Sequence, residues 1–234
     1  MISDASTISG WLQPREMRFL SLAVLNQKCA GEVVELGFYH GKSTSVIART
    51  MQHVGRGKLA TVDPIDPTSV KENLSRLGLL NQVDIHHQSS LEFAKAWNSP
   101  IALLWHDGAN DYGTVLQDCK NLFPFLADQS IVAFHDVLNP SGERIEVFDQ
   151  LVLNSANFGW VGVCGSIGFG RYHKSPVVDA KLLNEKRRLS RKLKRLVPFH
   201  SASHPNPKGL KHVIYRILRT RVPHGEIQSF PADA

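Results

Sequence analysis

Acidic and imidazole side chains follow the apolar runs of this 234-residue sequence, at the points where each run stops. Carboxylates can accept hydrogen bonds from two hydroxyl groups or bind a hard cation, and a neutral imidazole can take a proton from a hydroxyl. Because the carboxyl ends of parallel strands meet at one crevice, these groups would face a common ligand. They are the acidic and imidazole groups of Glu35, Asp63, Asp107, His135 and Asp136, together with the hydroxyls of Ser89 and Ser90.

The elements that must position these groups alternate between strand and helix. Short apolar runs predict strands at 33–36, 58–62, 83–87, 101–105 and 130–134. Apolar residues at helical spacing predict helices at 14–30, 69–78, 89–97, 112–126 and 143–157. Two more short strands, at 159–164 and 166–172, predict a hairpin that turns at Gly165. This α/β order predicts a Rossmann-like, doubly wound, mostly parallel seven-stranded sheet with an antiparallel edge hairpin.

A glycine loop within Glu32–Thr50 joins the first expected strand to an amphipathic helix, where free backbone N–H groups can approach a ligand. The ending GKST suggests a phosphate-binding P-loop. That pattern needs four residues between its glycines, and this loop has three between Gly37 and Gly41. A dinucleotide fold is a second interpretation, although its G-x-G-x-x-G pattern is absent. The spacing favours a third interpretation, in which Ser43 and Thr44 cap the helix.

The third interpretation rests on the spacing Glu35-x-Gly37-x-x-x-Gly41-x-Ser43. This spacing resembles motif I of the class I S-adenosylmethionine-dependent methyltransferases. The resemblance implies that the glycine lets the backbone approach the methionine part of the cofactor. It also implies that Glu35, at the end of the strand, meets the ammonium group of the cofactor or a bridging water.

Two later segments extend the resemblance. Asp63 lies 26 residues after Gly37 and corresponds to the acid that binds the ribose hydroxyls in these enzymes. A carboxylate suits that role because it only accepts hydrogen bonds. The segment Ser89-Ser90-x-Glu92 resembles the one that brackets the adenine.

The match then narrows to one branch of these enzymes. The segments LLWHDGANDY at 103–112 and IVAFHDV at 131–137 look like the small O-methyltransferases with a D-G-x-H-x-Y…H-D signature. That branch includes enzymes that act on macrolide sugars, glycans and other small hydroxylated molecules. The resemblance covers residues 32–172 and implies S-adenosyl-L-methionine as the cofactor. The implied cofactor-binding residues are Glu35, Gly37, Tyr39, Gly41, Ser43, Asp63, Ser89, Ser90 and His106.

The same resemblance implies a divalent metal and a catalytic base. In the sugar-methylating relatives, the corresponding residues hold magnesium, and here these are Asp107, His135 and Asp136. Such an ion would lower the pKa of the acceptor hydroxyl and aim it at the methyl group. We expect His135 and Asp107 to be the catalytic residues, with His135 as a metal ligand or as the general base.

One residue departs from the signature. The histidine of D-G-x-H is Asn110 here, and an amide cannot take a proton at neutral pH. Three alternatives follow. His135 or His106 is the base, or the metal alone acidifies the acceptor, or catalysis has been lost and the chain is a silent S-adenosylmethionine-binding module.

The composition is ordinary for a soluble globular protein, with 42% hydrophobic and 21% charged residues. No unbroken apolar run approaches the roughly 18 residues of a membrane span. The first residues lack the basic-then-apolar pattern of a secretion signal. Three cysteines without a C-x-x-C pair favour buried free thiols in a reducing compartment. We therefore expect a cytoplasmic protein.

The net charge of +6 is concentrated near the C-terminal end. Residues 179–222 carry thirteen Lys or Arg against two acids, a balance of +11, whereas residues 1–178 have a balance of −3. This contrast predicts a methyltransferase domain over 1–178 and a basic, amphipathic helical appendage and tail over 179–234. Helices are expected at 179–197 and after a loop at 198–207.

Basic amphipathic helices pack on their own protein, lie on anionic membranes or bind nucleic acid. Packing is the simplest interpretation, and an anionic membrane surface, at the inner face of the membrane, ranks second. Nucleic acid ranks third because no aromatic residue interleaves the first charge cluster. The expected function is methyl transfer to a hydroxyl of a sugar, glycan or other small molecule. RNA methylation through the tail is the alternative, and a homo-oligomer is compatible with the sequence.

Overall fold

A seven-stranded sheet forms the centre of the molecule, with the strand order β3-β2-β1-β4-β5-β7-β6. The computed structural model describes residues 4–203 and 206–225. Strands β1 to β5 are parallel, and β7 pairs antiparallel with both β5 and β6. The strands are β1 Glu32–Leu36, β2 Leu59–Asp63, β3 Val83–His87, β4 Ile101–His106, β5 Leu126–Phe134, β6 Phe158–Cys164 and β7 Ile167–Tyr172. The predicted Rossmann-like sheet and its edge hairpin are confirmed.

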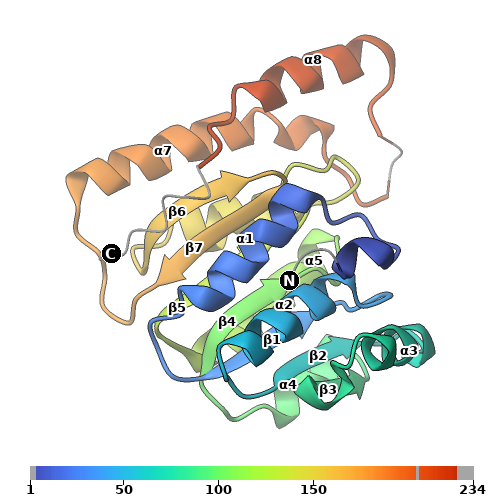
Figure 1. Cartoon of the computed structure of the whole chain (residues 1–234). Coiled ribbons are helices and arrows are strands. Elements are labelled where there is room, and N and C mark those ends of the chain that lie inside the picture. Colours follow the sequence, from blue (N-terminus) through green and yellow to red (C-terminus); the bar gives the residue numbers. More distant parts are fainter. Residues whose placement is uncertain (1–3, 204–205, 226–234) are drawn as a thin grey trace.

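Helices cover both faces of this sheet (Figure 1). The α-helices are α1 Pro14–Leu25, α2 Lys42–His53, α3 Thr68–Arg76, α4 Ser90–Ala96, α5 Tyr112–Leu122, α6 Arg144–Phe148, α7 Ala180–Lys194 and α8 Gly209–Thr220. Short helical turns are η1 Ala5–Thr7, η2 Leu80–Gln82, η3 Phe123–Phe125, η4 Asp149–Leu153 and η5 Val197–Phe199. Helices α1 and α2 contact each other on one face, and α4 and α5 contact each other on the other.

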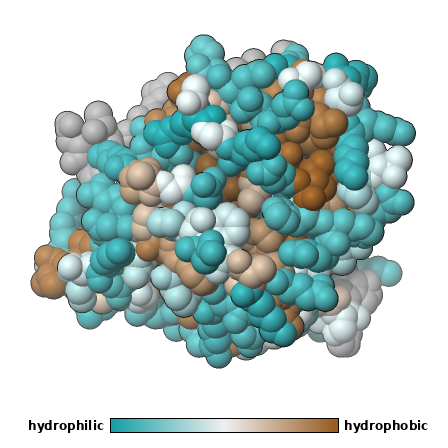
Figure 2. Space-filling view, turned by 90° about the horizontal axis from the view of Figure 1, so that it is seen from below, coloured by the Kyte–Doolittle hydropathy of each residue, from teal (hydrophilic) through white to brown (hydrophobic). Residues whose placement is uncertain are grey.

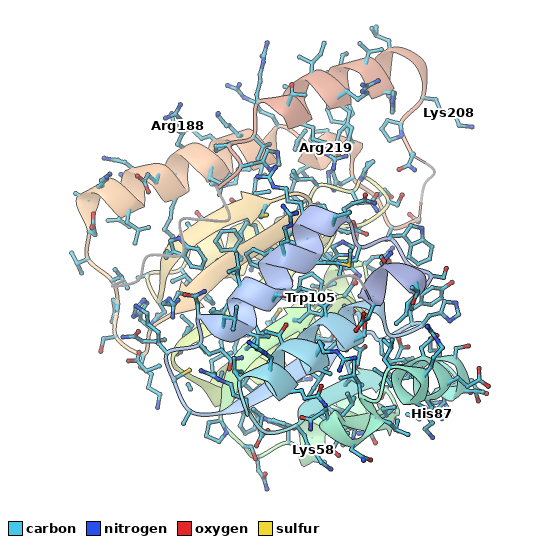
Figure 3. The ribbon with its side chains drawn as sticks, viewed as in Figure 1. Lys58, His87, Trp105, Arg188, Lys208 and Arg219 are labelled. Carbon is cyan, nitrogen blue, oxygen red and sulfur yellow. The ribbon has the colours of Figure 1, made fainter. Side chains whose placement is uncertain are left out.

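The core lies on both sides of the central strands. Every residue of β4 is buried, as the continuous apolar run IALLW predicts for a strand covered on both faces. Trp105 lies at the centre of the molecule and is fully buried (Figure 3). The strand order reverses between β1 and β4, so the loops after these two strands diverge and leave a crevice at their carboxyl ends.

Several local expectations differ from the structure, and one is the expected helix at 14–30, which ends at Leu25. The expected helix at 112–126 ends at Leu122, because Pro124 cannot continue it and opens η3 instead. The expected helix at 143–157 is a short α-helix followed by a widened turn, in which the Asn154 N–H donates to the Asp149 carbonyl. Ser43 and Thr44 do not cap α2, since Gly41 holds the N-cap position in a left-handed conformation.

The basic segment forms the two expected helices, which lie together at one end of the molecule (Figure 1). Helix α7 adds Leu189 and Leu193 to the core, whereas α8 buries only Tyr215. The division into a domain at 1–178 and an appendage at 179–234 remains a prediction, and residues 226–234 of it lie outside the described residues. No helix in the described part of the chain is both long and apolar enough to cross a membrane.

Candidate active site

A cavity of about 510 Å³ opens at the carboxyl ends of β1 and β4, where the strand order reverses. Mostly apolar walls with a few convergent polar groups are typical of small-molecule sites. Most of the site residues predicted from the sequence line it, namely Gly37, Tyr39, Ser43, Asp63, Ser89, Ser90, Asp107, His135 and Asp136. Glu35, Gly41 and His106 do not line the cavity, although the sequence predicts that they bind the cofactor.

The loop after β1 requires glycine at Gly37. This residue has a φ of +89°, and a Cβ added to it would lie 2.5 Å from the carbonyl oxygen of Asp107. Only a residue without a side chain lets the β1 and β4 loops approach this closely. The backbone N–H groups of Phe38 and Tyr39 donate to Oδ2 of Asp63, at 3.0 and 3.1 Å. Asp63 therefore shapes the glycine loop as well as lining the cavity.

Glu35 lies beneath the loop and is fully buried. Its Oε2 accepts hydrogen bonds of 2.7 Å from the hydroxyls of Thr44 and Thr61. Its Oε1 has no hydrogen-bond partner among the described residues. Burial raises the pKa of this carboxyl to about 7, although the surrounding hydroxyls oppose the shift. A buried acceptor without a partner under a glycine loop fits the ammonium group of an amino acid or a bridging water.

On the β3 and β4 side, a buried hydrogen-bonded chain supports the two serines. The Ser90 hydroxyl donates to Oδ1 of Asp118 at 2.6 Å, and Nε2 of His106 lies 3.1 Å from Oδ2 of the same carboxylate. Ser89 is the N-cap of α4 and forms a capping box with Glu92. His106 is completely buried, so its position supports a role in holding Asp118 rather than direct contact with a ligand.

His135 lies between two carboxylates. Its Nδ1 is 3.0 Å from Oδ1 of Asp107, and its Nε2 is 3.3 Å from Oε2 of Glu16. Burial alone would lower the pKa of His135, but Asp107 and Glu16 outweigh it and raise that pKa to about 10. The ring is therefore a cation at neutral pH and donates from both nitrogens. In this state the ring could not accept a proton from a substrate, and the base role that the sequence suggests stays a prediction.

Glu16, on α1, is a member of the site that the sequence analysis missed. Its Oε1 accepts hydrogen bonds from the backbone N–H and the hydroxyl of Ser166, at 2.7 and 2.6 Å. Burial opposes ionisation, but the bonds from His135 and Ser166 outweigh it and lower the pKa of Glu16 to about 2. Glu16 therefore carries a buried negative charge that links α1, β5 and the hairpin. Its place in an amphipathic helix gave no signal of this role.

Arg144 is a second residue that the sequence analysis missed. Its side chain is only 4% exposed, and it donates from Nε to the Ala109 carbonyl and from Nη2 to the Gly108 carbonyl, at 2.8 and 2.6 Å. Its Nη1 lies 3.7 Å from Oδ1 of Asp107 and 3.9 Å from Oδ2 of Asp136. A permanent cation therefore lies between two carboxylates that the sequence assigns to a metal.

The three residues expected to hold magnesium do not converge on one ion. Asp107 faces Nδ1 of His135, whereas the nearest oxygen of Asp136 is 3.9 Å from Nε2, the other ring nitrogen. One ion could bind only one of these nitrogens. Among the described residues, no group of three or more His, Cys, Asp or Glu side chains is arranged to hold a metal. With His135 and Arg144 supplying positive charge, the arrangement does not fit a divalent cation.

The N-terminal segment closes one side of the cavity. Residues 9–12 line it, and Nζ of Lys42 donates to the Gly10 carbonyl at 3.1 Å. Trp11 is 73% exposed, and its ring centroid lies 5.1 Å from that of Tyr39. An exposed aromatic pair beside a cavity is a candidate platform for a ligand. The sequence gave no signal for Trp11, because only the fold brings it beside the glycine loop.

Asn110 lies at the position where the signature has a histidine. Its side-chain amide donates to the Ser141 carbonyl at 3.0 Å, and its own carbonyl accepts from the Glu143 N–H at 2.7 Å. The residue therefore holds the loop between β5 and α6, and it is not among the residues that line the cavity. At this end of the cavity, the polar groups that line it are Asp107, His135 and Asp136.

A family model matches the part of the chain that carries most of these residues. Residues 34–137, from β1 to the residue after Asp136, match the family model of a methyltransferase domain. The matched range contains the glycine loop and all of the acidic groups at the strand ends. No curated protein matches the chain.

Several solved structures share the fold. The O-methyltransferase TomG from Streptomyces achromogenes, in complex with SAM, is 15% identical, with a TM-score of 0.56 over 70% of this chain and 82% of that one. An O-methyltransferase from Bacillus cereus, in complex with SAH, is 16% identical, with a TM-score of 0.57 over 73% and 86%. CalS11, a TDP-rhamnose 3'-O-methyltransferase, is 21% identical, with a TM-score of 0.54 over 68% and 81%. At these identities the likeness establishes the fold.

Proposed function

We propose that the protein transfers a methyl group from S-adenosylmethionine to a hydroxyl of a small acceptor, because residues 34–137 match the family model of a methyltransferase domain. The observation that carries this proposal is the contact between Asp107 and His135 at the wall of the cavity. Several proteins of the same fold are O-methyltransferases, and one of them acts on a sugar nucleotide. A sugar, glycan or other hydroxylated small molecule is therefore the acceptor class we propose.

The residues of the cavity fit the three parts of the cofactor. We assign the amino-acid part to the loop at Gly37 and, through a bridging water, to Oε1 of Glu35, which lies beneath the loop and lacks a partner among the described residues. We assign the ribose to Asp63 and the adenine to the region of Ser89 and Ser90, all of which line the cavity. S-adenosylmethionine supplies the methyl group as an electrophile.

Asp107 is the group that we propose receives the proton. As the acceptor oxygen bonds to the methyl carbon, the bond from that carbon to sulfur breaks and its electron pair stays on sulfur. The hydroxyl proton then passes to Asp107. The contacts of this carboxylate with His135 and Arg144 use Oδ1, so we assign the proton to Oδ2. His135 is a positioning residue, because a doubly hydrogen-bonded imidazolium fixes the carboxylate without taking the proton.

The proposal does not need a divalent metal. The predicted magnesium would have to displace Arg144, whose guanidinium is buried and bound to the carbonyls of Gly108 and Ala109. We expect EDTA to change turnover by less than about twofold, because the Arg144 guanidinium already lies within 4 Å of both Asp107 and Asp136. The measurement is initial rate with EDTA, with and without added Mg²⁺. Loss of activity in EDTA that Mg²⁺ restores would contradict this assignment.

Trp11 and Tyr39 form the platform that we propose for the acceptor. Replacing Trp11 by Ala should raise the KM for the acceptor about 2- to 10-fold, since aromatic contacts contribute roughly 0.5–1.5 kcal/mol. Binding of S-adenosylhomocysteine should stay within about twofold, because we place the cofactor deeper in the loop. Steady-state kinetics and calorimetric titration test both parts. Val54→Ala, at an exposed residue outside the cavity, is the control.

The experiment that tests the function as a whole begins with calorimetric titration of S-adenosylhomocysteine. A screen of hydroxylated acceptors with labelled methyl donor then follows. Cofactor binding without transfer to any hydroxylated acceptor would favour the silent module, and transfer to RNA alone would favour the RNA methyltransferase. We also propose a cytoplasmic location, which the free state of Cys29, Cys119 and Cys164 supports.

A further inference from the structure

Helix α8 exposes an apolar stripe. Leu210, Val213, Ile214 and Ile217 are 75, 51, 40 and 47% exposed and follow the i, i+3, i+4, i+7 spacing of one helix face. A different face of the same helix holds Tyr215, which is buried. Four neighbouring aliphatic side chains in water are unfavourable unless another surface covers them.

Helix α7 does not share this property. Its Leu189 and Leu193 are buried in the core, and Nζ of Lys186 donates to the Phe158 carbonyl at 2.8 Å. Helix α7 is therefore a basic helix that packs on its own protein, as the first interpretation of this segment states. It leaves the stripe on α8 without a partner among the described residues.

Basic groups border the stripe. At 100° per residue, Lys211 and Arg216 flank it on its two sides, and Arg221 lies at its C-terminal end. All three side chains are exposed. The wider segment 179–222 has a charge balance of +11, and Arg188 and Lys208 project from it, away from the sheet (Figure 3). The opposite end of the molecule, seen from below, is largely hydrophilic but has one larger hydrophobic area toward the upper right (Figure 2).

Charge and shape decide between the surfaces that could cover the stripe. A second copy of the chain would bring two strongly basic segments together, which electrostatic repulsion disfavours. Nucleic acid would use aromatic side chains to stack on bases, but the stripe is aliphatic and Tyr215 is buried. An apolar stripe bordered by Lys and Arg fits the boundary between headgroups and acyl chains of an anionic bilayer.

We propose that α8 docks this protein onto an anionic lipid bilayer, with Leu210, Val213, Ile214 and Ile217 at the acyl boundary and the basic side chains on the headgroups. This inference stands apart from the catalytic proposal.

The buried side of α8 connects the docking surface to the cavity. The Tyr215 hydroxyl donates to the Leu138 carbonyl, two residues after Asp136. In the segment before α8, Nδ1 of His200 hydrogen-bonds to the Gly142 carbonyl at 3.0 Å. These contacts fix α8 on the loop between β5 and α6. A bilayer bound by the stripe would lie on the side of α8 away from this loop, so α8 would separate the bilayer from the loop that follows Asp136.

Vesicle co-sedimentation of the full chain tests the proposal. The vesicles contain phosphatidylcholine alone or with about 30% phosphatidylserine, at about 0.1 and 0.5 M salt. We expect the partition coefficient to be at least about tenfold higher on anionic vesicles at low salt. Ile214→Gln with Ile217→Gln should lower it about tenfold or more, because the helix then loses apolar contact area. Both residues are exposed, so the fold should persist, which circular dichroism checks.

Matched control variants distinguish binding through the stripe from nonspecific adsorption to vesicles. Val178→Gln changes an aliphatic residue that is 90% exposed but lies outside the stripe, and it should leave binding unchanged. Lys211→Glu with Arg216→Glu should weaken binding, whereas Lys71→Glu on α3 should have a much smaller effect. Equal binding to both vesicle types, or binding insensitive to the stripe substitutions, would overturn the proposal. Two other results would also overturn the proposal if the protein does not bind anionic vesicles. One is tight RNA binding in gel shifts, and the other is a dimer that dissociates when the stripe residues are substituted.

Discussion

Replacing Asp107 by Asn is expected to lower kcat by roughly 10²- to 10⁴-fold, the usual contribution of a positioned general base. The amide keeps the size of the carboxylate and can still accept a hydrogen bond from His135, so the cavity should keep its shape. It cannot take a proton from the acceptor hydroxyl. The barrier to methyl transfer therefore rises while the geometry of binding remains.

Single-turnover methyl transfer and calorimetric titration of S-adenosylhomocysteine test this expectation together. The dissociation constant should change by less than about fivefold, since the charge at Asp107 is balanced locally by His135 and Arg144. Asp136→Asn is the matched variant, and its rate should fall by less than about tenfold. If both substitutions abolish activity equally and Mg²⁺ is required, Asp107 and Asp136 act as metal ligands. Full activity of the Asp107→Asn variant would show that Asp107 has no catalytic role.

The fold could be predicted because its signals are local. The run IALLW at 101–105 is apolar throughout, which is typical of a strand covered on both faces. Gly165 marks the turn of the edge hairpin. The glycine loop could be predicted from spacing, because close approach of the Asp107 carbonyl to Gly37 leaves no room for a side chain. Strand-end acids were found because parallel strands bring their carboxyl ends to one edge.

The charge balance of the site could not be predicted, because it depends on residues far apart in the sequence. Glu16 and His135 are 119 positions apart, and Glu16 looks like a surface acid of an amphipathic helix. Arg144 begins a short helix and gives no sequence signal that its guanidinium turns inward to the Gly108 carbonyl. Without these two residues, His135 looks like a neutral base and Asp107 like a metal ligand. The fold places carboxylates at both nitrogens of the first, which favours its protonated form, and places His135 and Arg144 beside the second.

Glu16→Gln is expected to lower the free energy of unfolding by roughly 3 kcal/mol near neutral pH, because it breaks a buried ion pair. Glu16 and the imidazolium of His135 stabilise each other's charged forms, and Gln can supply only a neutral acceptor. Ser166 also loses its charged hydrogen-bond partner, so α1 is held less firmly to the hairpin. The exposed residue Glu72 on α3 offers a control, and Glu72→Gln should change the stability by no more than about 0.5 kcal/mol.

The pH dependence identifies the ion pair as the cause. The pKa of Glu16 falls from 4.5 to about 2 on folding, so its contribution is present above pH 4.5 and is lost as the pH falls toward 2. The pKa of His135 rises from 6.5 to about 10, so its contribution is present below pH 6.5 and is lost as the pH rises toward 10. Urea unfolding across this range should therefore show the widest gap between wild type and Glu16→Gln between pH 4.5 and 6.5. A gap that stays constant up to pH 10 would mean that packing, and not the paired charges, makes Glu16 stabilising, because only the charged pair titrates.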